Sequence, residues 1–223
     1  MAGAPTQSAR LGWHGLAGDR RFAFRRVEDR SGFPWLSATH LPELLLYRPL
    51  GQEEGTGEPL PTHVGTPSGQ EFELHSEVLR AEVAARTGSD VELMWLRNGT
   101  FDDAVVSVIS LATVAAVGRE AGVDPDLRRF RPNIVLETDD QQPFNEGSWV
   151  GRTLVFGGTE PHAAVCVTAD DVRCMMINLD PDTARQDARV MRAVVQRHGN
   201  VAGVYGAVVR TGTLHVGQEI WLT

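Results

Sequence analysis

Apolar and polar residues alternate with a period of two over many short runs of this chain, and only a few segments show helical spacing. Short runs of this kind, bounded by Gly, Pro, Asn and Asp, are typical of β-strands. The turn Arg210-Thr211-Gly212-Thr213 predicts a hairpin between the last two runs. The predicted strands are residues 20–27, 33–36, 44–47, 71–74, 90–96, 133–137, 151–156, 163–167, 174–179, 204–209 and 214–222.

Three helices are predicted from their spacing and their ends. Ser76 and Ser110 are good N-caps, and Gly88 and Gly122 can each end a helix in the left-handed conformation. The predicted helices are residues 76–88, 111–120 and a segment within 183–198. Many short strands with so few helices favour a β-rich α+β fold with a barrel-like sheet.

Composition narrows the class of protein. The chain has 223 residues, 42% hydrophobic and 22% charged, which is enough to bury a core. Its formal net charge of −8 argues against a nucleic acid or an anionic membrane as the main partner. We find no signal peptide and no apolar run of the roughly 18 residues that span a bilayer. We therefore expect a cytoplasmic protein, with residues 1–15 poorly ordered.

The two cysteines, Cys166 and Cys174, make no disulfide framework. Cys174 is the more informative because it follows Arg173 and opens an apolar run that ends at Asp-Pro-Asp. An adjacent cation favours the thiolate, the form that ligates soft metals or carries sulfur. The plain alternative is a small buried hydrophobe, a common role of free cysteine. Cys166 lies within an apolar strand and is interpreted as structural.

A second candidate element lies upstream, in the run Arg129-Phe130-Arg131-Pro132-Asn133. Arginine forks bind phosphate bidentately, and an amide can both donate and accept. Arg131 and Asn133 can also simply end a strand and satisfy backbone groups. A cysteine together with an anion-binding element indicates a cofactor that carries phosphate and metal. The phosphate-loop, dinucleotide-binding and nucleophile-elbow motifs are absent from the sequence.

Several motifs, taken jointly and in order, resemble the MOSC domain, which is found at the C-terminus of molybdenum cofactor sulfurases. They are Arg129-Phe130-Arg131-Pro132-Asn133-Ile134-Val135, Gly151-Arg152-Thr153-Leu154, Arg173-Cys174 with Asp180-Pro181-Asp182-Thr183, Val204-Tyr205-Gly206 and Gly212-Thr213-Leu214-His215-Val216-Gly217-Gln218. An early run, Gly15-Leu16-Ala17-Gly18-Asp19-Arg20, is similar to the N-terminal β-barrel domain that precedes it. The pair is similar to the mitochondrial amidoxime-reducing component and its bacterial relatives.

This resemblance implies a MOSC-type β-barrel with peripheral helices over residues 96–223 and a β-barrel-like subdomain over residues 1–95. It implies molybdenum cofactor (molybdopterin) and the two-electron reduction of N-hydroxylated small molecules, with electrons from a partner protein. Carried over residue by residue, it makes Cys174 the catalytic thiol and the metal ligand. The residues that it implies hold the pterin or its phosphate are Arg20, Arg131, Asn133 and Arg173.

The sequence departs from the family pattern at two cofactor-contacting segments. The opening strand with Pro-Val-Lys-Ser is missing, and Asp102-Asp103 stands where the family commonly has hydroxyl side chains. A carboxylate is unfavourable beside a phosphate dianion. Asp102 is a candidate for acid–base catalysis, although paired aspartates also cap turns.

Three hypotheses therefore stand. The first is a molybdenum-cofactor enzyme. The second is a sulfurtransferase in which Cys174 carries sulfur as a persulfide, received from a sulfur-donor protein, without bound molybdenum; the missing opening segment favours it. The third is a repurposed MOSC protein that binds another small molecule or a protein partner in a biosynthetic pathway.

Overall fold

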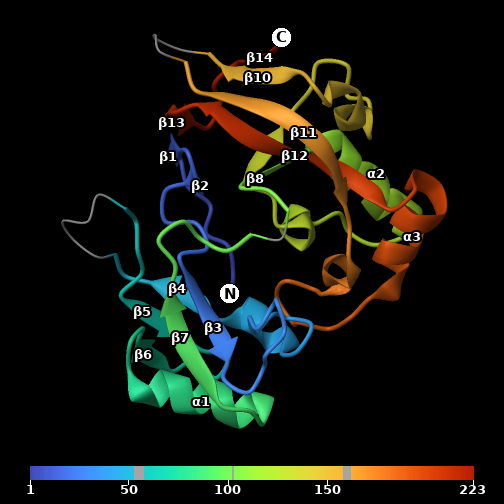
Figure 1. Ribbon diagram of the computed structural model, residues 1–223. Helices are drawn as coiled ribbons and strands as arrows, with labels where there is room; N and C mark the ends of the chain where they lie inside the picture. The colour runs from blue at the N-terminus through green and yellow to red at the C-terminus, as the bar shows by residue number, and fades with distance from the viewer. Residues whose placement is uncertain (53–57, 102, 158–161) are drawn as a thin grey trace. The chain divides into compact units, whose positions relative to one another are not determined.

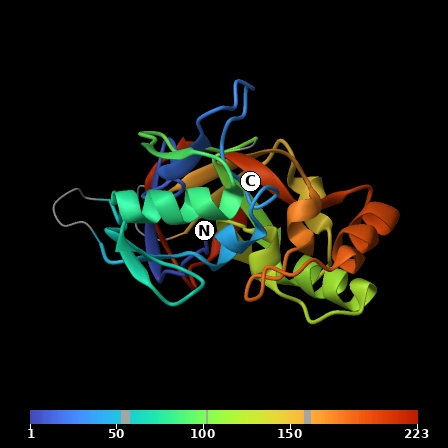
Figure 2. The ribbon, with the colours of Figure 1, turned by 90° about the horizontal axis from the view of Figure 1, so that it is seen from below.

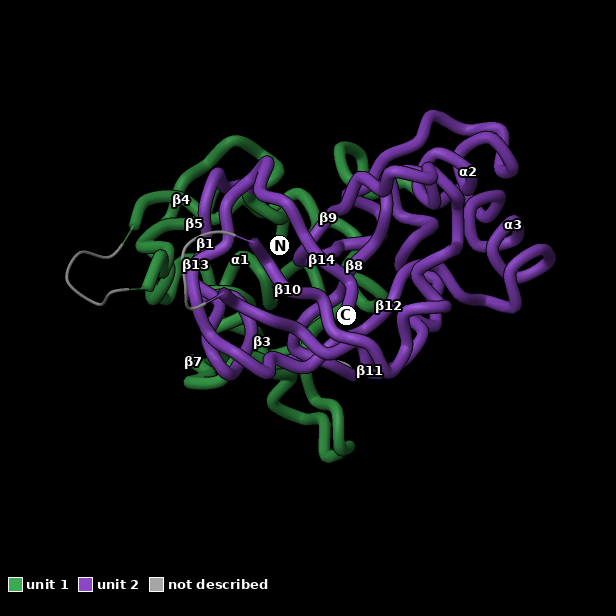
Figure 3. Tube along the Cα trace, turned by 90° about the horizontal axis from the view of Figure 1, so that it is seen from above, with its two compact units in different colours: residues 1–4, 18–100, 181–185 green, residues 5–17, 101–180, 186–223 purple. Residues whose placement is uncertain are grey.

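The computed structural model describes residues 1–52, 58–101, 103–157 and 162–223. The chain divides into two compact units, each assembled from segments that are far apart in sequence (Figure 3). Unit 1 comprises residues 1–4, 18–100 and 181–185; unit 2 comprises residues 5–17, 101–180 and 186–223. The domain boundary predicted near residue 95 stays a prediction.

A six-stranded sheet is the main element of unit 2, with the strand order β14-β10-β11-β12-β8-β9. Neighbouring strands are antiparallel, except that β8 and β9 are parallel. The two longest strands, β11 and β12, run side by side as a curved ribbon (Figure 1). The bounds are β8 (Val106–Ser110), β9 (Ile134–Leu136), β10 (Thr153–Phe156), β11 (Ala164–Val172), β12 (Val201–Arg210) and β14 (Ile220–Leu222).

A second sheet of unit 2 has the order β13-β1-β2, formed by Gly212–His215, Ser8–Gly12 and Gly15–Leu16. It corrects two predictions. Residues 8–12 form a strand rather than a poorly ordered segment, because β13 supplies a partner and Leu11 is fully buried. The predicted hairpin after β12 is also wrong, since β13 pairs with β1 instead. Neither partner is visible in the local pattern.

Two helices of unit 2, α2 (Leu111–Ala121) and α3 (Ala188–His198), lie side by side; they are the yellow-green and orange-red helices of Figure 2. They are accompanied by the 3₁₀ helices η2 (Leu127–Phe130), η3 (Asn145–Trp149) and η4 (Met175–Asn178). Strand β8 is buried along its whole length. Its Val106 and Val108 belong to a core formed within the sheets, and Ile109 belongs to a core shared with α2 and α3.

Unit 1 contains an antiparallel pair, β3 with β7, and a three-stranded sheet in the order β4-β5-β6. Helix α1 packs against β6 and β7, and its Leu79 and Val83 are fully buried. Ser76 caps this helix and Gly88 ends it in the left-handed conformation, as predicted. The bounds are β3 (Phe22–Arg26), β4 (Arg48–Leu50), β5 (His63–Gly65), β6 (Glu71–Glu73), β7 (Val91–Trp95), α1 (Glu77–Thr87) and η1 (Pro42–Leu46).

Two predicted strands are 3₁₀ helices in the structure. Residues 44–47 fall largely in η1, where Pro42 starts the turn and the adjacent Leu44 and Leu45 are both buried. Residues 174–179 form η4 and its caps, and there Ile177 and Asn178 are both buried. Burial of consecutive residues does not fit a strand with one buried face, and a short apolar run alone does not separate the two conformations.

Two further segments are shorter than predicted. Residues 33–36 contribute only an isolated bridge between Trp35 and Arg25. Helix α3 begins at Ala188, because Asp187 is its N-cap and Pro181 lies upstream. The β-rich α+β class is nevertheless confirmed. Among the described residues, no helix combines the length and the apolar character needed to cross a membrane.

Candidate functional site

Cys174 lies between β11 and η4, in extended backbone with φ −106° and ψ 176°. Successive side chains of extended backbone point to opposite faces. Val172 is 57% exposed, Arg173 is 7% exposed, and Cys174 is again exposed. The thiol therefore faces outward, whereas Cys166, within β11, is half-buried. Both cysteines are free thiols.

The Arg173 guanidinium is held by two hydrogen bonds and one charge contact within the protein. Its Nε donates to the carbonyl oxygen of Ala202 at 2.6 Å, and its Nη1 donates to the carbonyl oxygen of Phe130 at 2.8 Å. Its Nη2 lies 2.8 Å from Oδ2 of Asp171, as a charge contact rather than an aligned hydrogen bond. The cofactor contact expected of Arg173 stays a prediction; here Nε and Nη1 donate to carbonyl groups of the protein, and Nη2 makes only the charge contact with Asp171.

Asp171 is the buried counter-ion of this arginine and is 1% exposed. It accepts a hydrogen bond from Oγ of Ser107 at 2.8 Å and another from the hydroxyl of Tyr205. Burial raises the pKa of Asp171, and the charge of Arg173 opposes that rise. Burial lowers the pKa of Arg173. The pKa of Tyr205 is raised, first by burial and then by the charge of Asp171. The pair is thus buried with several hydrogen-bond partners, which a buried ion pair requires.

The second predicted element, Arg131 to Asn133, lies between η2 and β9. Arg131 is left-handed (φ 51°) although it precedes Pro132, a context that disfavours helical backbone. Its N–H donates to the carbonyl oxygen of Arg128 at 3.2 Å. Asn133 forms two hydrogen bonds with the backbone of Ser107. The N–H of Asn133 donates to the carbonyl oxygen of Ser107 at 2.9 Å, and its Oδ1 accepts from the N–H of Ser107 at 3.0 Å. The cofactor contacts of both residues stay predictions.

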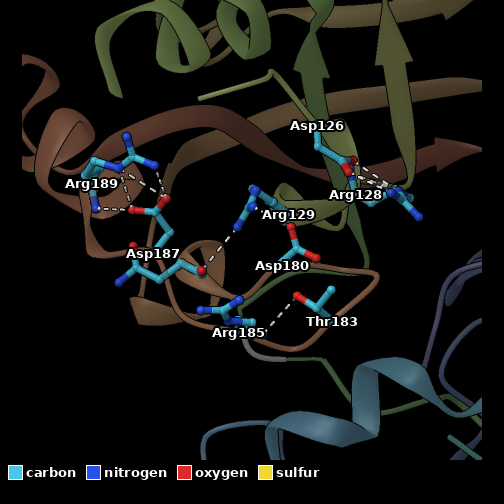
Figure 4. Close-up of polar contacts among 9 residues, drawn as sticks. Asp126, Arg128, Arg129, Asp180, Thr183, Arg185, Asp187 and Arg189 are labelled. Atoms are coloured by element: carbon cyan, nitrogen blue, oxygen red, sulfur yellow. Dashed lines mark hydrogen bonds and ion pairs between the residues drawn. The ribbon is translucent and has the colours of Figure 1, made fainter. Parts of the chain in front are cut away.

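Arg129 provides another link between the two predicted elements (Figure 4). Its side chain is 9% exposed. Nη1 donates to the carbonyl oxygen of Asn178 at 3.1 Å, and Nη2 donates to Oδ2 of Asp180 at 2.9 Å. Because Asn178 ends η4, Arg129 joins η2 to the turn that follows Cys174. The neighbouring pairs in Figure 4, Arg128 with Asp126 and Arg189 with Asp187, are more exposed.

The remaining predicted residues lie elsewhere. Arg20 belongs to unit 1, is left-handed (φ 50°), and its Nη1 lies 2.8 Å from Oδ2 of Asp19. Asp102 lies outside the described residues. Asp103 is exposed, and its charge acts on Asp171 in the same direction as burial. The roles predicted for Arg20 and Asp102 stay predictions.

Two residues of this network, Asp171 and Ser107, are not among the residues predicted from the sequence. Asp171 had a readable signal, because residues two apart in a strand share a face and Arg173 carries the opposite charge. Ser107 had none, since its contact with Asp171 spans 64 residues.

The fold and the site define a β-rich domain with an outward-facing cysteine just after strand β11 and an Arg-Pro-Asn element hydrogen-bonded to β8, another strand of the same sheet. The family model for the MOSC domain matches residues 79–221, more than half of the chain. The chain belongs to the MOSC domain family.

Solved and curated proteins add little to this assignment. The YuaD protein from Bacillus subtilis, known from a crystal structure, is 14% identical to this chain, with a TM-score of 0.48. That alignment covers 97% of this chain and 85% of the YuaD chain. No curated protein matches the chain in sequence.

Proposed function

We propose that this protein is a molybdenum-dependent oxidoreductase in which the Cys174 thiolate is the protein ligand of the metal in molybdenum cofactor. One observation carries this proposal: the thiol is exposed just after β11, in a chain that belongs to the MOSC family. When bound, the cofactor supplies two-electron chemistry toward N-hydroxylated or related small molecules. The chain supplies ligation, orientation and electrostatics.

The residues fit such a group in part. A thiolate is a soft ligand, and the Cys174 thiol is accessible from outside. Arg131 carries the charge expected at a phosphate, on a backbone conformation that is uncommon for a non-glycine residue. Arg173 instead points inward, so its support for the cofactor would be indirect. The contact of Arg20 with the cofactor remains part of the proposal.

The surroundings of the thiol suggest what approaches it. Val172 is 57% exposed and Met175 is 40% exposed, so apolar side chains flank Cys174 on both sides in sequence. Such a rim favours a small molecule with an apolar part, or the apolar surface of a partner protein that delivers electrons. We therefore include an electron-transfer partner in the proposal.

The test is the molybdenum content of protein purified from a host that makes the cofactor. We expect bound molybdenum in the wild type and in Cys166→Ser, and its loss in Cys174→Ser. The two variants exchange the same atoms, so Cys166→Ser controls for the loss of a thiol as such. Absence of molybdenum from the wild type, or equal content in all three proteins, would exclude Cys174 as ligand.

The second candidate is a sulfurtransferase. Two observations favour it: the carboxylate of Asp103 is exposed, and the side chain of Arg173 points inward. Both would weaken the binding of a phosphate group. The Cys174 thiolate would attack the outer sulfur of a donor persulfide. A Cys174 persulfide would form and the donor thiolate would leave. An acceptor nucleophile would then take the outer sulfur and release the Cys174 thiolate.

Mass spectrometry of intact protein and of its peptides decides between these candidates. After incubation with a cysteine desulfurase and cysteine, the sulfurtransferase predicts one added sulfur on the Cys174 peptide and none on the Cys166 peptide. An unmodified Cys174 rules out the sulfurtransferase. Failure of both tests would leave the third hypothesis, a MOSC protein repurposed to bind another small molecule or protein.

A further inference from the structure

We propose that Arg173 is a positioning residue: its guanidinium, seated against a bulge at Gly203, turns Cys174 outward and fixes the segment from Phe130 to Asn133. This inference deepens the proposed function, since Cys174 and that segment are the parts expected to hold the cofactor. It rests on four contacts described above and on the backbone of β12.

Strand β12 has an irregularity opposite Asp171, beside the guanidinium of Arg173. Asp170 pairs with Val204 but Val172 pairs with Val201, so β12 has one residue more than β11 between these pairs. Gly203 lies in this bulge with φ +84°, in the left-handed region that favours glycine. A Cβ on Gly203 would lie 2.6 Å from the carbonyl oxygen of Val108 and 3.0 Å from Nη2 of Arg173. The missing side chain therefore leaves space for the guanidinium.

The buried guanidinium determines which way the thiol points. Asp171 and Arg173 occupy alternate positions and are both buried, while Val172 and Cys174 are both exposed. Because side chains alternate in extended backbone, anchoring Arg173 inward leaves Cys174 outward. A slip of one residue would bury the thiol and expose the charge.

The same guanidinium also closes a circuit of hydrogen bonds and one ion pair around the second element. Arg173 donates to the carbonyl of Phe130, at one end of the segment. Its counter-ion Asp171 accepts from Ser107, whose backbone exchanges two hydrogen bonds with Asn133 at the other end. Arg131, left-handed before a proline, lies between these two anchors. Cys174 and the Arg131 segment are thus linked through one side chain.

The test uses metal-free protein and the variant Arg173→Lys, which keeps the charge but lacks the fork that reaches two carbonyls and a carboxylate. Hydrogen exchange is followed at the amides of Arg131 and Asn133, and at Ile177, whose N–H donates to the carbonyl of Cys174. We expect protection to fall about tenfold at both elements, because hydrogen bonds from a charged group are lost. Val172→Ala, an exposed neighbour, should leave both unchanged.

Thiol alkylation separates positioning from general loosening. The wild-type Cys174 thiol is already exposed, so freeing the strand end lets it turn inward and slows its reaction with iodoacetamide severalfold. Cys166 is half-buried and should keep its rate. A merely structural role predicts the reverse, a faster Cys166 and an unchanged Cys174. That pattern, or unchanged exchange at Arg131 and Asn133 beside a loosened Ile177, would overturn the proposal.

A second variant covers the case in which Arg173→Lys fails to fold. Ser107→Ala removes one hydrogen bond to Asp171 and should lower protection at both elements by a smaller factor; no change at either overturns the proposal. The experiment needs no cofactor. An absence of molybdenum from the wild type would therefore refute the proposed function and leave the coupling measurable, whereas uncoupled exchange would refute only the positioning role.

Discussion

At the scale of single residues, the charges of Arg173 and Asp171 are held by partners within the protein rather than by solvent. Arg173 and Asp171 are buried together, and each gains further hydrogen bonds that offset desolvation. Asp187, the N-cap of α3, is a more exposed example: its Oδ1 accepts from the backbone N–H of Arg189 at 3.1 Å, and its carboxylate pairs with the guanidinium of Arg189. The hydrogen bonds from Arg189 lower the pKa of Asp187 from its ordinary value of 3.8 to about 2.

This lowered pKa gives the first prediction. A carboxyl with a depressed pKa contributes stability above its unfolded pKa and loses it as the pH falls through the folded pKa. We therefore expect the difference in free energy of unfolding between the wild type and Asp187→Asn to be constant above pH 3.8. It should shrink as the pH falls from there toward about 2. Urea unfolding over a pH series measures this difference. Asp124→Asn is the exposed control, and a difference that widens in acid would contradict the assignment.

At the scale of elements, one buried carboxylate fixes the start of α2. Glu146, in η3, is 1% exposed and accepts from the N–H of Ser110 at 2.6 Å and from the hydroxyl of Thr113 at 2.9 Å. Ser110 is at the same time the N-cap of α2. A carboxylate at this position also complements the positive end of the helix dipole. The contact joins η3 to the strand–helix junction.

We predict that Glu146→Gln lowers the free energy of unfolding by about 1–3 kcal/mol, because its amide keeps one acceptor oxygen and places an NH2 against the other of the two donors, Ser110 N–H or the Thr113 hydroxyl. Urea unfolding should show a lower midpoint with an unchanged slope. Glu137→Gln, a matched exchange at an exposed site, should have little effect. Equal effects of the two substitutions would show that the hydrogen bonds accepted by Glu146 do not contribute to stability.

Elements with local signals were predictable and those with distant partners were not. The caps at Ser76 and Ser110 and their glycine stops set α1 and α2 correctly, because capping depends on a few adjacent residues. The strand at residues 8–12 depends on pairing with β13, about two hundred residues away, which no local pattern contains. Residues 174–179 were misassigned because a short apolar run fits a strand and a 3₁₀ turn equally.

The same division holds for the candidate site. The sequence places Cys174 beside a cation, and the structure adds that the thiol is exposed and the cation buried. The guanidinium partners Ala202 and Phe130 are carbonyl groups, which are present at every residue, so no residue type marks them in advance. Gly203 could have been noticed only as one glycine among 23.

At the scale of the whole molecule, the net charge is negative, because 29 Asp and Glu residues outnumber 21 arginines; the sequence contains no lysine. An arginine fork suits fixed pairs with carboxylates and carbonyls, as in Arg129 and Arg173. An acidic surface also repels polyanions over roughly a Debye length of 8 Å at physiological ionic strength.

We therefore predict that the protein shows no measurable binding to duplex DNA or to vesicles rich in phosphatidylserine at physiological salt. Fluorescence anisotropy with labelled DNA and vesicle co-sedimentation measure this directly. Salt-sensitive binding at micromolar concentration would show that a local basic surface outweighs the net charge.

The central claim is that Cys174 is the protein's metal ligand, and molybdenum X-ray absorption tests it most directly. For protein from a cofactor-competent host, we predict that the wild type and Cys166→Ser show the same sulfur shell around molybdenum. Any metal retained by Cys174→Ser should have one sulfur fewer. An unchanged sulfur shell in Cys174→Ser, or no molybdenum signal from the wild type, would contradict the account.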